Sequence, residues 1–305
     1  MDASPSDAAA GGGSATQRRP VSELTKRVVF AVVAIPILIG FVWLGGSVFA
    51  ALLAVGAMLS AYEFYRLAIG AGSEPLWGHG VALSALVPLL VHARFLGLWT
   101  PGVSLVMLLV LELLTVALGV RGSGGKPLEV VGITLLGVFY TGGMLSFAYA
   151  LRYHEYAVGA SAGTALVTLP MALTWATDSG GFFVGRSLGR RKLMPAVSPK
   201  KTVEGAIGGL VMGILVTVLY GRYVLPPLAH LALPFWRAIV FGALVSTAGQ
   251  VGDLVESMLK REAGVKDSSK LIPGHGGMLD RVDSLLFTLP VGFVLLGWML
   301  VPAVR

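Results

Sequence analysis

Long apolar runs follow one another along nearly the whole sequence. A helix needs about 20 mostly apolar residues to cross a bilayer, and nine stretches come close to that length. These stretches are residues 28–45, 47–70, 77–98, 101–120, 128–151, 161–185, 205–225, 235–258 and 283–302. Only 13% of the 305 residues are charged, whereas a soluble domain carries about 25%. The sequence therefore predicts an all-α, polytopic integral membrane protein with about nine transmembrane helices.

Polar and charged segments divide the chain into three parts. Residues 1–22 are small, polar and rich in glycine, which predicts a disordered N-terminal tail. Residues 23–160 hold five of the apolar runs and few charges, so we interpret them as transmembrane scaffold helices. Residues 161–305 form a second transmembrane region with two strongly charged loops, 186–204 and 259–282. We therefore expect the chemistry of the protein in this second region.

The distribution of lysine and arginine predicts how the chain crosses the membrane. If the N-terminus is cytoplasmic, most of the 23 Lys and Arg residues and both charged loops face the cytoplasm, as the positive-inside rule requires. Basic loops at helix ends suit anionic headgroups and polyphosphates, and they lack the single basic face of a nucleic-acid-binding domain. We expect a multi-pass protein of the cell (inner or plasma) membrane, with the lipid bilayer as a partner and no nucleic acid.

Two acidic helix faces lie within residues 246–287, on either side of a charged, glycine-rich hairpin. Polar residues three or four positions apart share one face of a helix. The face before the hairpin carries Gln250, Asp253, Ser257 and Lys260. The face after the hairpin carries Asp280, Asp283 and Ser284. A helical hairpin whose charges only sit in the headgroup layer would need neither these aligned acids nor the run Gly-His-Gly-Gly.

The hairpin can bring acids of the two helices together. Asp253 and Asp280 would then repel each other unless a cation lies between them. Oxygen ligands in a chain without cysteine indicate Mg²⁺ or a similar hard ion. We predict that these two carboxylates bind the metal and that Asp283 is a third acid close by. For Asp283, an ion pair with Arg281 or Lys260 stays open as the alternative.

A second polar segment precedes this one in the chain. Thr174, Asp178 and Gly181 share a helix face, and the glycines around them would let a helix or a ligand approach closely. A basic loop follows and leads into SPKKTVEG at residues 198–205. Hydroxyl groups, ammonium groups and a helix N-terminus in one place suit phosphate. The candidate phosphate-binding side chains are Ser198, Lys200 and Lys201.

Two acidic residues lie inside expected spans of the first region. An acid at this depth is a functional candidate because burying it in a membrane is costly. For Glu63 we favour a carboxylate near a helix end that snorkels or is capped by Arg66. For Glu112, a structural and a functional role both stay open.

Four short sequences in the 246–287 segment carry a resemblance to a known family. They are SMLKR at 257–261, KD at 266–267, PGHGG at 273–277 and DRVD at 280–283. Together they resemble the signature of the phosphatidate cytidylyltransferases, or CDP-diacylglycerol synthases. The SPKKTVEG run and the helix that carries Asp178 resemble the same family, so the resemblance covers residues 165–290. One departure is Gly181-Phe182, where members of the family often have Ala-Tyr.

The resemblance implies a nucleotidyltransferase that transfers a cytidylyl group from CTP to phosphatidic acid and releases pyrophosphate. The product would be CDP-diacylglycerol for phospholipid biosynthesis, and the active site would face the cytoplasm. Mg²⁺ is the implied cofactor, while a second cation and a homodimer stay open. Two alternatives remain: a CTP-dependent enzyme acting on a polyprenol or an ether lipid, and a cation-coupled membrane transporter.

The resemblance also implies roles for single residues. The implied catalytic residues are Asp253, Asp280, Lys260, Arg261 and His275. The implied substrate-binding residues are Ser198, Lys200, Lys201, Asp178, Lys266, Asp267 and Arg281. The implied metal ligands are Asp253, Asp280 and Asp283. In the glycine-rich turn, His275 has the only side chain able to donate to phosphate, so we expect it to contact phosphate or to handle a proton; a purely structural turn is the alternative.

Overall fold

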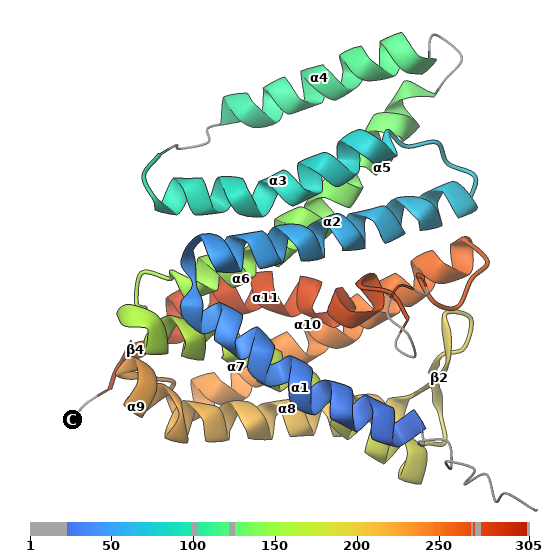
Figure 1. Cartoon of the computed structure of the whole chain (residues 1–305). Helices are drawn as coiled ribbons and strands as arrows, with labels where there is room; N and C mark the ends of the chain where they lie inside the picture. The colour runs from blue at the N-terminus through green and yellow to red at the C-terminus, as the bar shows by residue number, and fades with distance from the viewer. Residues whose placement is uncertain (1–22, 99–102, 122–125, 270, 272–275, 304–305) are drawn as a thin grey trace, which may run out of the picture.

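A computed structural model of the chain describes residues 23–98, 103–121, 126–269, 271 and 276–303 (Figure 1). These residues form helices joined by short connections, with two small β-ribbons, so the fold class is all-α as predicted. The expected tail, residues 1–22, lies outside the described residues, and so does His275.

The first half of the chain consists of long helices that stack on one side of the molecule. Their bounds are α1 Glu23–Leu44, α2 Gly46–Gly70, α3 Trp77–Phe95, α4 Val103–Arg121, α5 Pro127–Val138, the π-helical segment η1 Phe139–Gly143, and α6 Met144–Arg152. The last three segments run into one another and make a single apolar helix, as expected for one span. Between α1 and α2 the chain turns at Gly45, whose φ of 62° is readily adopted only by glycine. In Figure 1, α4, α3 and α2 lie one beyond the other on the side away from α8.

The second half of the chain alternates long helices with two short ribbons. Its elements are α7 Gly159–Leu188, β1 Lys192–Met194, β2 Ser198–Thr202, α8 Val203–Tyr223, α9 Leu225–Ala229, β3 Leu231–Ala232, α10 Phe235–Glu262, α11 Leu279–Met299 and β4 Val301–Pro302. Strands β1 and β2 pair antiparallel, with Lys192 opposite Thr202 and Met194 opposite Ser198. Strands β3 and β4 also pair antiparallel. The expected loop 186–204 therefore consists of the end of α7, the β1–β2 ribbon and the start of α8.

Six helices in the described part of the chain are long and apolar enough to cross a membrane by length and composition. They are Gly46–Gly70, Trp77–Phe95, Pro127–Arg152, Val203–Tyr223, Phe235–Glu262 and Leu279–Met299. The expected count of nine crossings and the cytoplasmic N-terminus stay predictions. Two helices also extend beyond their apolar runs: Lys260 lies on α10 and Asp280 on α11, not in the expected loop 259–282. The two charged side chains pair with each other, which offsets the cost of placing them on helices within the bundle.

Small residues let α7 and α8 lie side by side. A Cβ added at Gly209 would lie 2.7 Å from the carbonyl oxygen of Thr177, and one at Gly180 would lie 2.9 Å from that of Gly208. Such close backbone contact is typical of glycine at helix interfaces in membranes. It agrees with the expectation that the glycines after Asp178 admit a neighbouring helix. Strand β2 leads directly into α8 and contacts α10, so the packing of α8 against α7 also fixes where β2 lies.

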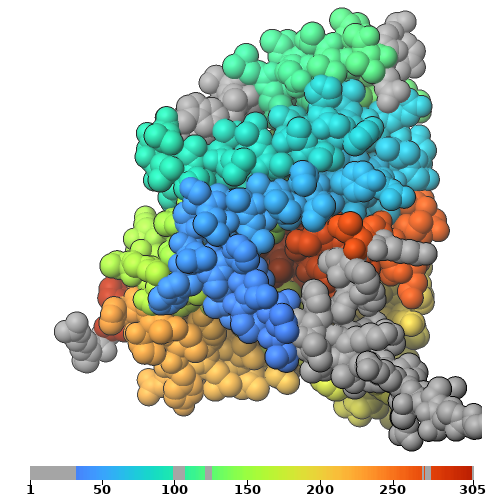
Figure 2. Space-filling model, in the orientation of Figure 1, coloured from blue at the N-terminus to red at the C-terminus, as the bar shows by residue number. Residues whose placement is uncertain are grey.

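The main core extends over α2, α6, α7, α10 and α11, with Tyr65, Tyr149 and Phe241 among its fully buried side chains. Large apolar side chains are also exposed on the outer surface, for example Leu118 on α4 and Trp298 on α11. Extensive exposed apolar surface marks a membrane-facing protein. Figure 2 shows α1 crossing one face of the molecule diagonally, between α2 and α8.

Candidate active site

Three carboxylates meet where α10 packs against α11. Asp253 and Glu256 are three residues apart on α10 and so share a face, while Asp283 lies on α11. Each offers an oxygen, and these oxygens all lie within 4.8 Å of one another. We call Asp253, Glu256 and Asp283 the acid group. Gly252 allows the helices to meet here, because a Cβ at this position would lie 2.7 Å from the carbonyl oxygen of Asp283.

Glu256 is the member of the acid group that was not singled out from the sequence. Its side chain is fully buried, and one of its oxygens accepts a hydrogen bond from Lys260. The other oxygen, Oε1, has no hydrogen-bond partner among the described residues. Leaving a buried carboxylate oxygen without a donor is costly, so this position favours a cation. The available signal was its spacing of three residues from Asp253.

Asp280 faces the hairpin and not the acid group. Its Oδ1 lies 2.7 Å from Lys260 Nζ. Its Oδ2 accepts hydrogen bonds from Gly277 N and Ser268 Oγ, both at 2.8 Å, and from Ser268 N at 3.1 Å. The expected pairing of Asp253 with Asp280 is therefore not formed, because both oxygens of Asp280 already have other partners. Lys260 bonds to Glu256 as well and so connects the acid group to the hairpin.

The alternative considered for Asp283 was an ion pair with a neighbouring cation, and the described part of the structure does not show it. In the part of the chain that the structure describes, it forms no ion pair with Arg281 or Lys260. Its Oδ1 instead accepts a hydrogen bond from the backbone N–H of Ser284 at 2.6 Å. Its place beside Asp253, as an acid close by, is as predicted.

The β1–β2 ribbon brings a cation to the acid group. Lys201, on β2, places its Nζ 2.6 Å from Asp253 Oδ2. Its Nζ atom is buried and has no further partner among the described residues, so N–H donors of this ammonium group remain for another acceptor. The next residue, Thr202, caps α8 by accepting a hydrogen bond from Gly205 N at 3.1 Å. The capped helix start sets the direction of β2 and with it the position of Lys201.

Asp178, on α7, borders the same place. The charges of Asp253, Lys201 and Arg281 all act on its carboxylate. Its side chain is exposed in the structure, so it lies at the edge of the site. The structure thus brings together three segments that are far apart in the sequence.

The remaining predicted residues lie around the hairpin and the ribbon. Arg261 donates from Nε to the carbonyl oxygen of Val197 and from Nη1 to that of Val265, at 3.2 Å each, and so joins the hairpin to the ribbon. Ser198 is half-buried on β2. Four more predicted residues are exposed: Lys200, Lys266, Asp267 and Arg281. Within the described ranges, no hydrogen bond or ion pair joins these four to the acid group.

The two intramembrane acids of the first half have different surroundings. Glu63 is fully buried on α2, and its oxygens accept hydrogen bonds from four residues of the second half: Ser268, Ser269, Met278 and Leu279. The interpretation of a helix-end carboxylate that snorkels or is capped by Arg66 is therefore wrong, because the side chain is fully buried and bonded to other groups. The Arg66 guanidinium instead lies 5.9 Å from the centre of the Tyr62 ring. Glu112 is exposed on α4, which packs against α5.

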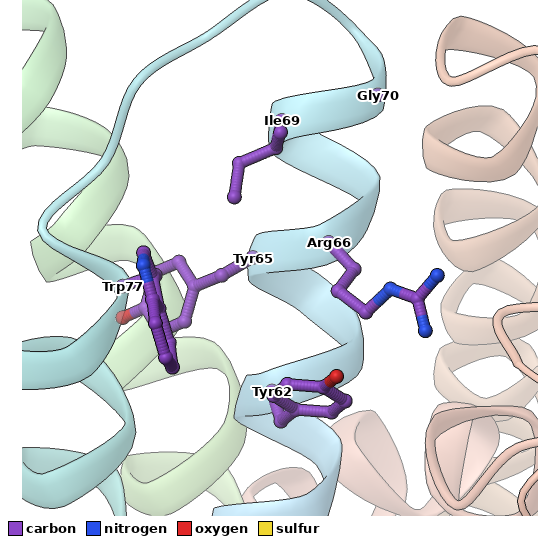
Figure 3. A pocket seen from close by; sticks show the side chains of 6 residues that line it. All are labelled: Tyr62, Tyr65, Arg66, Ile69, Gly70 and Trp77. Atoms are coloured by element: carbon purple, nitrogen blue, oxygen red, sulfur yellow. The ribbon is translucent and has the colours of Figure 1, made fainter.

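A cavity with a volume of about 410 Å³ lies apart from the acid group, between α2 and the start of α3 (Figure 3). It is lined by Tyr62, Tyr65, Arg66, Ile69, Gly70 and Trp77. In Figure 3, Tyr65 and Trp77 lie on one side of α2 and Arg66 points to the other. None of the predicted site residues that the structure describes lines this cavity, so the candidate active site is defined by converging charges and not by this hollow.

The fold and the site together define a multi-pass membrane protein in which acidic and basic side chains from distant segments gather within the helix bundle. A family model described as "Cytidylyltransferase family" matches residues 25–299. The chain belongs to this family, which confirms the resemblance seen in its sequence motifs.

Curated relatives with the name phosphatidate cytidylyltransferase are similar to this chain. The Pseudomonas aeruginosa protein is 37% identical over 286 residues, covering 90% of this chain and 98% of that protein. The Staphylococcus haemolyticus protein is 32% identical over 273 residues, covering 88% and 98%. The Bacillus subtilis protein is 40% identical over 169 residues, and there the match covers 55% of this chain and 59% of the relative.

Proposed function

We infer that the protein is an integral-membrane enzyme that transfers the cytidylyl group of CTP to phosphatidic acid, giving CDP-diacylglycerol and pyrophosphate. Family membership and the names of the relatives support this activity. One structural observation carries the assignment of the site. The acid group, Lys201 and Lys260 meet next to the hairpin that bears the signature motifs.

The acid group has the ligands that Mg²⁺ prefers. Its three carboxylates present oxygens within 4.8 Å of one another, and hard cations take oxygen ligands. Glu256 Oε1 is buried and has no donor in the described part of the chain, so a cation would satisfy it. Asp253, Glu256 and Asp283 would hold the ion, and a second cation stays open. When bound, Mg²⁺ would neutralise the phosphate oxygens of CTP and make the α-phosphorus more electrophilic.

The polar side chains around the acid group differ in the hydrogen bonds and ion pairs that they already form, and we assign their roles accordingly. Lys201 keeps unused N–H donors beside Asp253, so we assign it to the triphosphate. Ser198, on the same ribbon, and the remaining Nη2 of Arg261, which is bonded to the ribbon through Nε, would meet the leaving pyrophosphate. Lys260 is held between Glu256 and Asp280, so its main task is to position the acid group.

The reaction requires little covalent chemistry from the protein. An oxygen of the phosphatidate phosphate attacks the α-phosphorus of CTP and forms a new P–O bond. The bond from this phosphorus to the oxygen of the β-phosphate breaks, and pyrophosphate leaves with the electron pair. Placement of the two substrates and stabilisation of the developing charge therefore account for catalysis.

The two substrates reach the site from different media. CTP is highly charged and comes from water, whereas phosphatidic acid keeps its acyl chains in the bilayer and its phosphate at the interface. Asp178 is exposed at the edge of the site and Arg281 acts on it, so we place the lipid phosphate near these residues. The positive-inside rule puts this end of the bundle in the cytoplasm of the cell.

The position of the label in CTP tests the proposed function. The purified protein is given phosphatidic acid, Mg²⁺ and CTP labelled either at the α- or at the γ-phosphate. Cytidylyl transfer puts the α-label into extractable lipid and the γ-label into pyrophosphate. A CTP-dependent kinase acting on a polyprenol would instead put the γ-label into lipid. Label transfer to an ether lipid or a polyprenyl phosphate but not to phosphatidic acid would overturn the assigned substrate, and transfer to no lipid would overturn the activity.

A further inference from the structure

Glu63 links the two halves of the chain through one buried carboxylate. It lies on α2 and is fully buried. Among the described residues it accepts four hydrogen bonds, all from residues 205 to 216 positions later in the sequence: Ser269 Oγ at 2.6 Å and Met278 N at 3.0 Å to Oε1, and Ser268 Oγ at 2.9 Å and Leu279 N at 2.7 Å to Oε2. A buried carboxylate is tolerated when donors of this kind surround it.

The four donors lie at both ends of the segment that carries PGHGG. Ser268 and Ser269 precede this segment, and Met278 and Leu279 follow it at the start of α11. The first N–H groups of a helix have no partner within the helix, and a carboxylate there is also favoured by the helix dipole. Glu63 therefore fastens the entry and the exit of the hairpin to a helix of the first half.

The same hydrogen bonds continue to the acid group. Ser268 Oγ lies 2.9 Å from Glu63 Oε2 and 2.8 Å from Asp280 Oδ2, so the two carboxylates share its one O–H donor. Asp280 Oδ1 lies 2.7 Å from Lys260 Nζ. Lys260 in turn bonds to Glu256. The groups are closely packed here, since a Cβ added at Gly277 would collide with Ser268 Oγ and Glu63 Oε2.

We propose that Glu63 is a positioning residue for cytidylyl transfer. It holds the hairpin so that Asp280 and Lys260 keep Glu256 in place beside Asp253 and Asp283. This inference rests on the proposed function, because it concerns the metal-binding geometry of the same site. It assigns to α2, in the scaffold half, a part in catalysis that reaches the reacting groups only through other residues.

The test compares Glu63→Gln with Glu112→Gln, a matched loss of one carboxylate on exposed α4. Glutamine keeps the size of the side chain but replaces one acceptor oxygen with an NH₂ group that faces donors. Because small misplacement of reacting groups costs up to about 100-fold in rate, we expect kcat of Glu63→Gln to fall about 10- to 100-fold. We also expect the Mg²⁺ concentration for half-maximal activity to rise severalfold. Glu112→Gln should match the wild-type protein in both.

The Mg²⁺ requirement separates positioning from a purely structural role. If Glu63 only stabilised the fold, Glu63→Gln would lower the folded fraction and the total rate but leave the Mg²⁺ requirement and the KM for CTP unchanged. That result would overturn the proposal. If Glu63→Gln does not fold, Ser269→Ala replaces it, since it removes one of the four hydrogen bonds and leaves Asp280 untouched. This milder variant should raise the Mg²⁺ requirement by a smaller factor, and an unchanged value would again contradict the proposal.

A second measurement does not depend on the activity. Lys266 is exposed in the hairpin, so the rate of tryptic cleavage after it reports how firmly the hairpin is held. Cleavage should be faster in Glu63→Gln than in Glu112→Gln, and equal rates would show that Glu63 does not fasten the hairpin. If the wild-type protein transfers no label from CTP, the proposed function fails, while this cleavage result still decides whether the anchor exists.

Discussion

Two sets of carboxylates lie in this bundle, each with one fully buried glutamate, and their oxygens have opposite surroundings. Glu63 and Asp280 have both oxygens bonded to hairpin groups or to Lys260. The acid group instead brings three like charges together and leaves Glu256 Oε1 without a donor in the described chain. Satisfied acids stabilise a fold, whereas crowded and partly unsatisfied acids destabilise it. Unfavourable arrangements of this kind concentrate at functional sites. The contrast therefore separates Glu63 and Asp280, which position the site, from the acid group, which we expect to bind the metal ion.

The largest expected effect comes from removing a charge from the acid group. Asp253→Asn and Asp283→Asn should each lower turnover by about 100- to 1,000-fold or more, a loss typical of removing a principal electrostatic contact in a site. Label transfer from α-labelled CTP at saturating substrate measures this loss. Wild-type turnover at ordinary Mg²⁺ in either variant would contradict the assignment.

Heat stability gives the control for these variants. Without Mg²⁺, the thermal midpoint of Asp283→Asn should equal or exceed that of the wild-type protein, since repulsion in the acid group decreases. With Mg²⁺ at about 100 times its Kd, the wild-type protein should gain about 2.7 kcal/mol in the free energy of unfolding, and Asp283→Asn should gain much less. Equal gains in both proteins would place the ion elsewhere.

Substitution of Lys260, which bonds to a carboxylate of each set, should cause a large loss of stability. Lys260→Met leaves Glu256 and Asp280 buried without their shared ammonium group. Removing one partner of a buried pair costs about 3–5 kcal/mol, which thermal unfolding in detergent measures.

The double variant Lys260→Met, Asp280→Asn sharpens this result. It removes a stranded charge, so it should recover part of the stability but not the activity. A Lys260→Met protein as stable as the wild type would show that the ion pairs seen here do not hold the hairpin.

The smallest effect concerns the cation contributed by the ribbon. Lys201→Ala removes the ammonium beside Asp253, and a charge-assisted hydrogen bond is worth about 1.5–3 kcal/mol. We therefore expect the KM for CTP to rise about tenfold or more, with a smaller change in the thermal midpoint. Lys192→Ala, on the exposed strand β1 of the same ribbon, is the matched control. If KM and kcat of Lys201→Ala both match those of Lys192→Ala, Lys201 does not bind the triphosphate.

The sequence by itself determined the membrane class, the positions of most helices and the family. These features depend on local quantities: the length of an apolar run, the cost of charge in hydrocarbon, and short motifs. Helical periodicity also predicted that Asp253 and Lys260 share a face. The closeness of Lys201 and Asp178 to Asp253 agrees with their common assignment to phosphate and substrate binding.

Only the tertiary structure decided which acids meet. Periodicity defines the faces of a helix but not the rotation of one helix against the next. Gly252 lies against the Asp283 backbone, and in this packing Asp283, and not Asp280, joins Asp253 and Glu256. The role of Glu63 was equally out of reach, because its partners begin 205 positions further along the chain. A local pattern predicts that a buried acid needs donors; only the folded chain determines which segment supplies them.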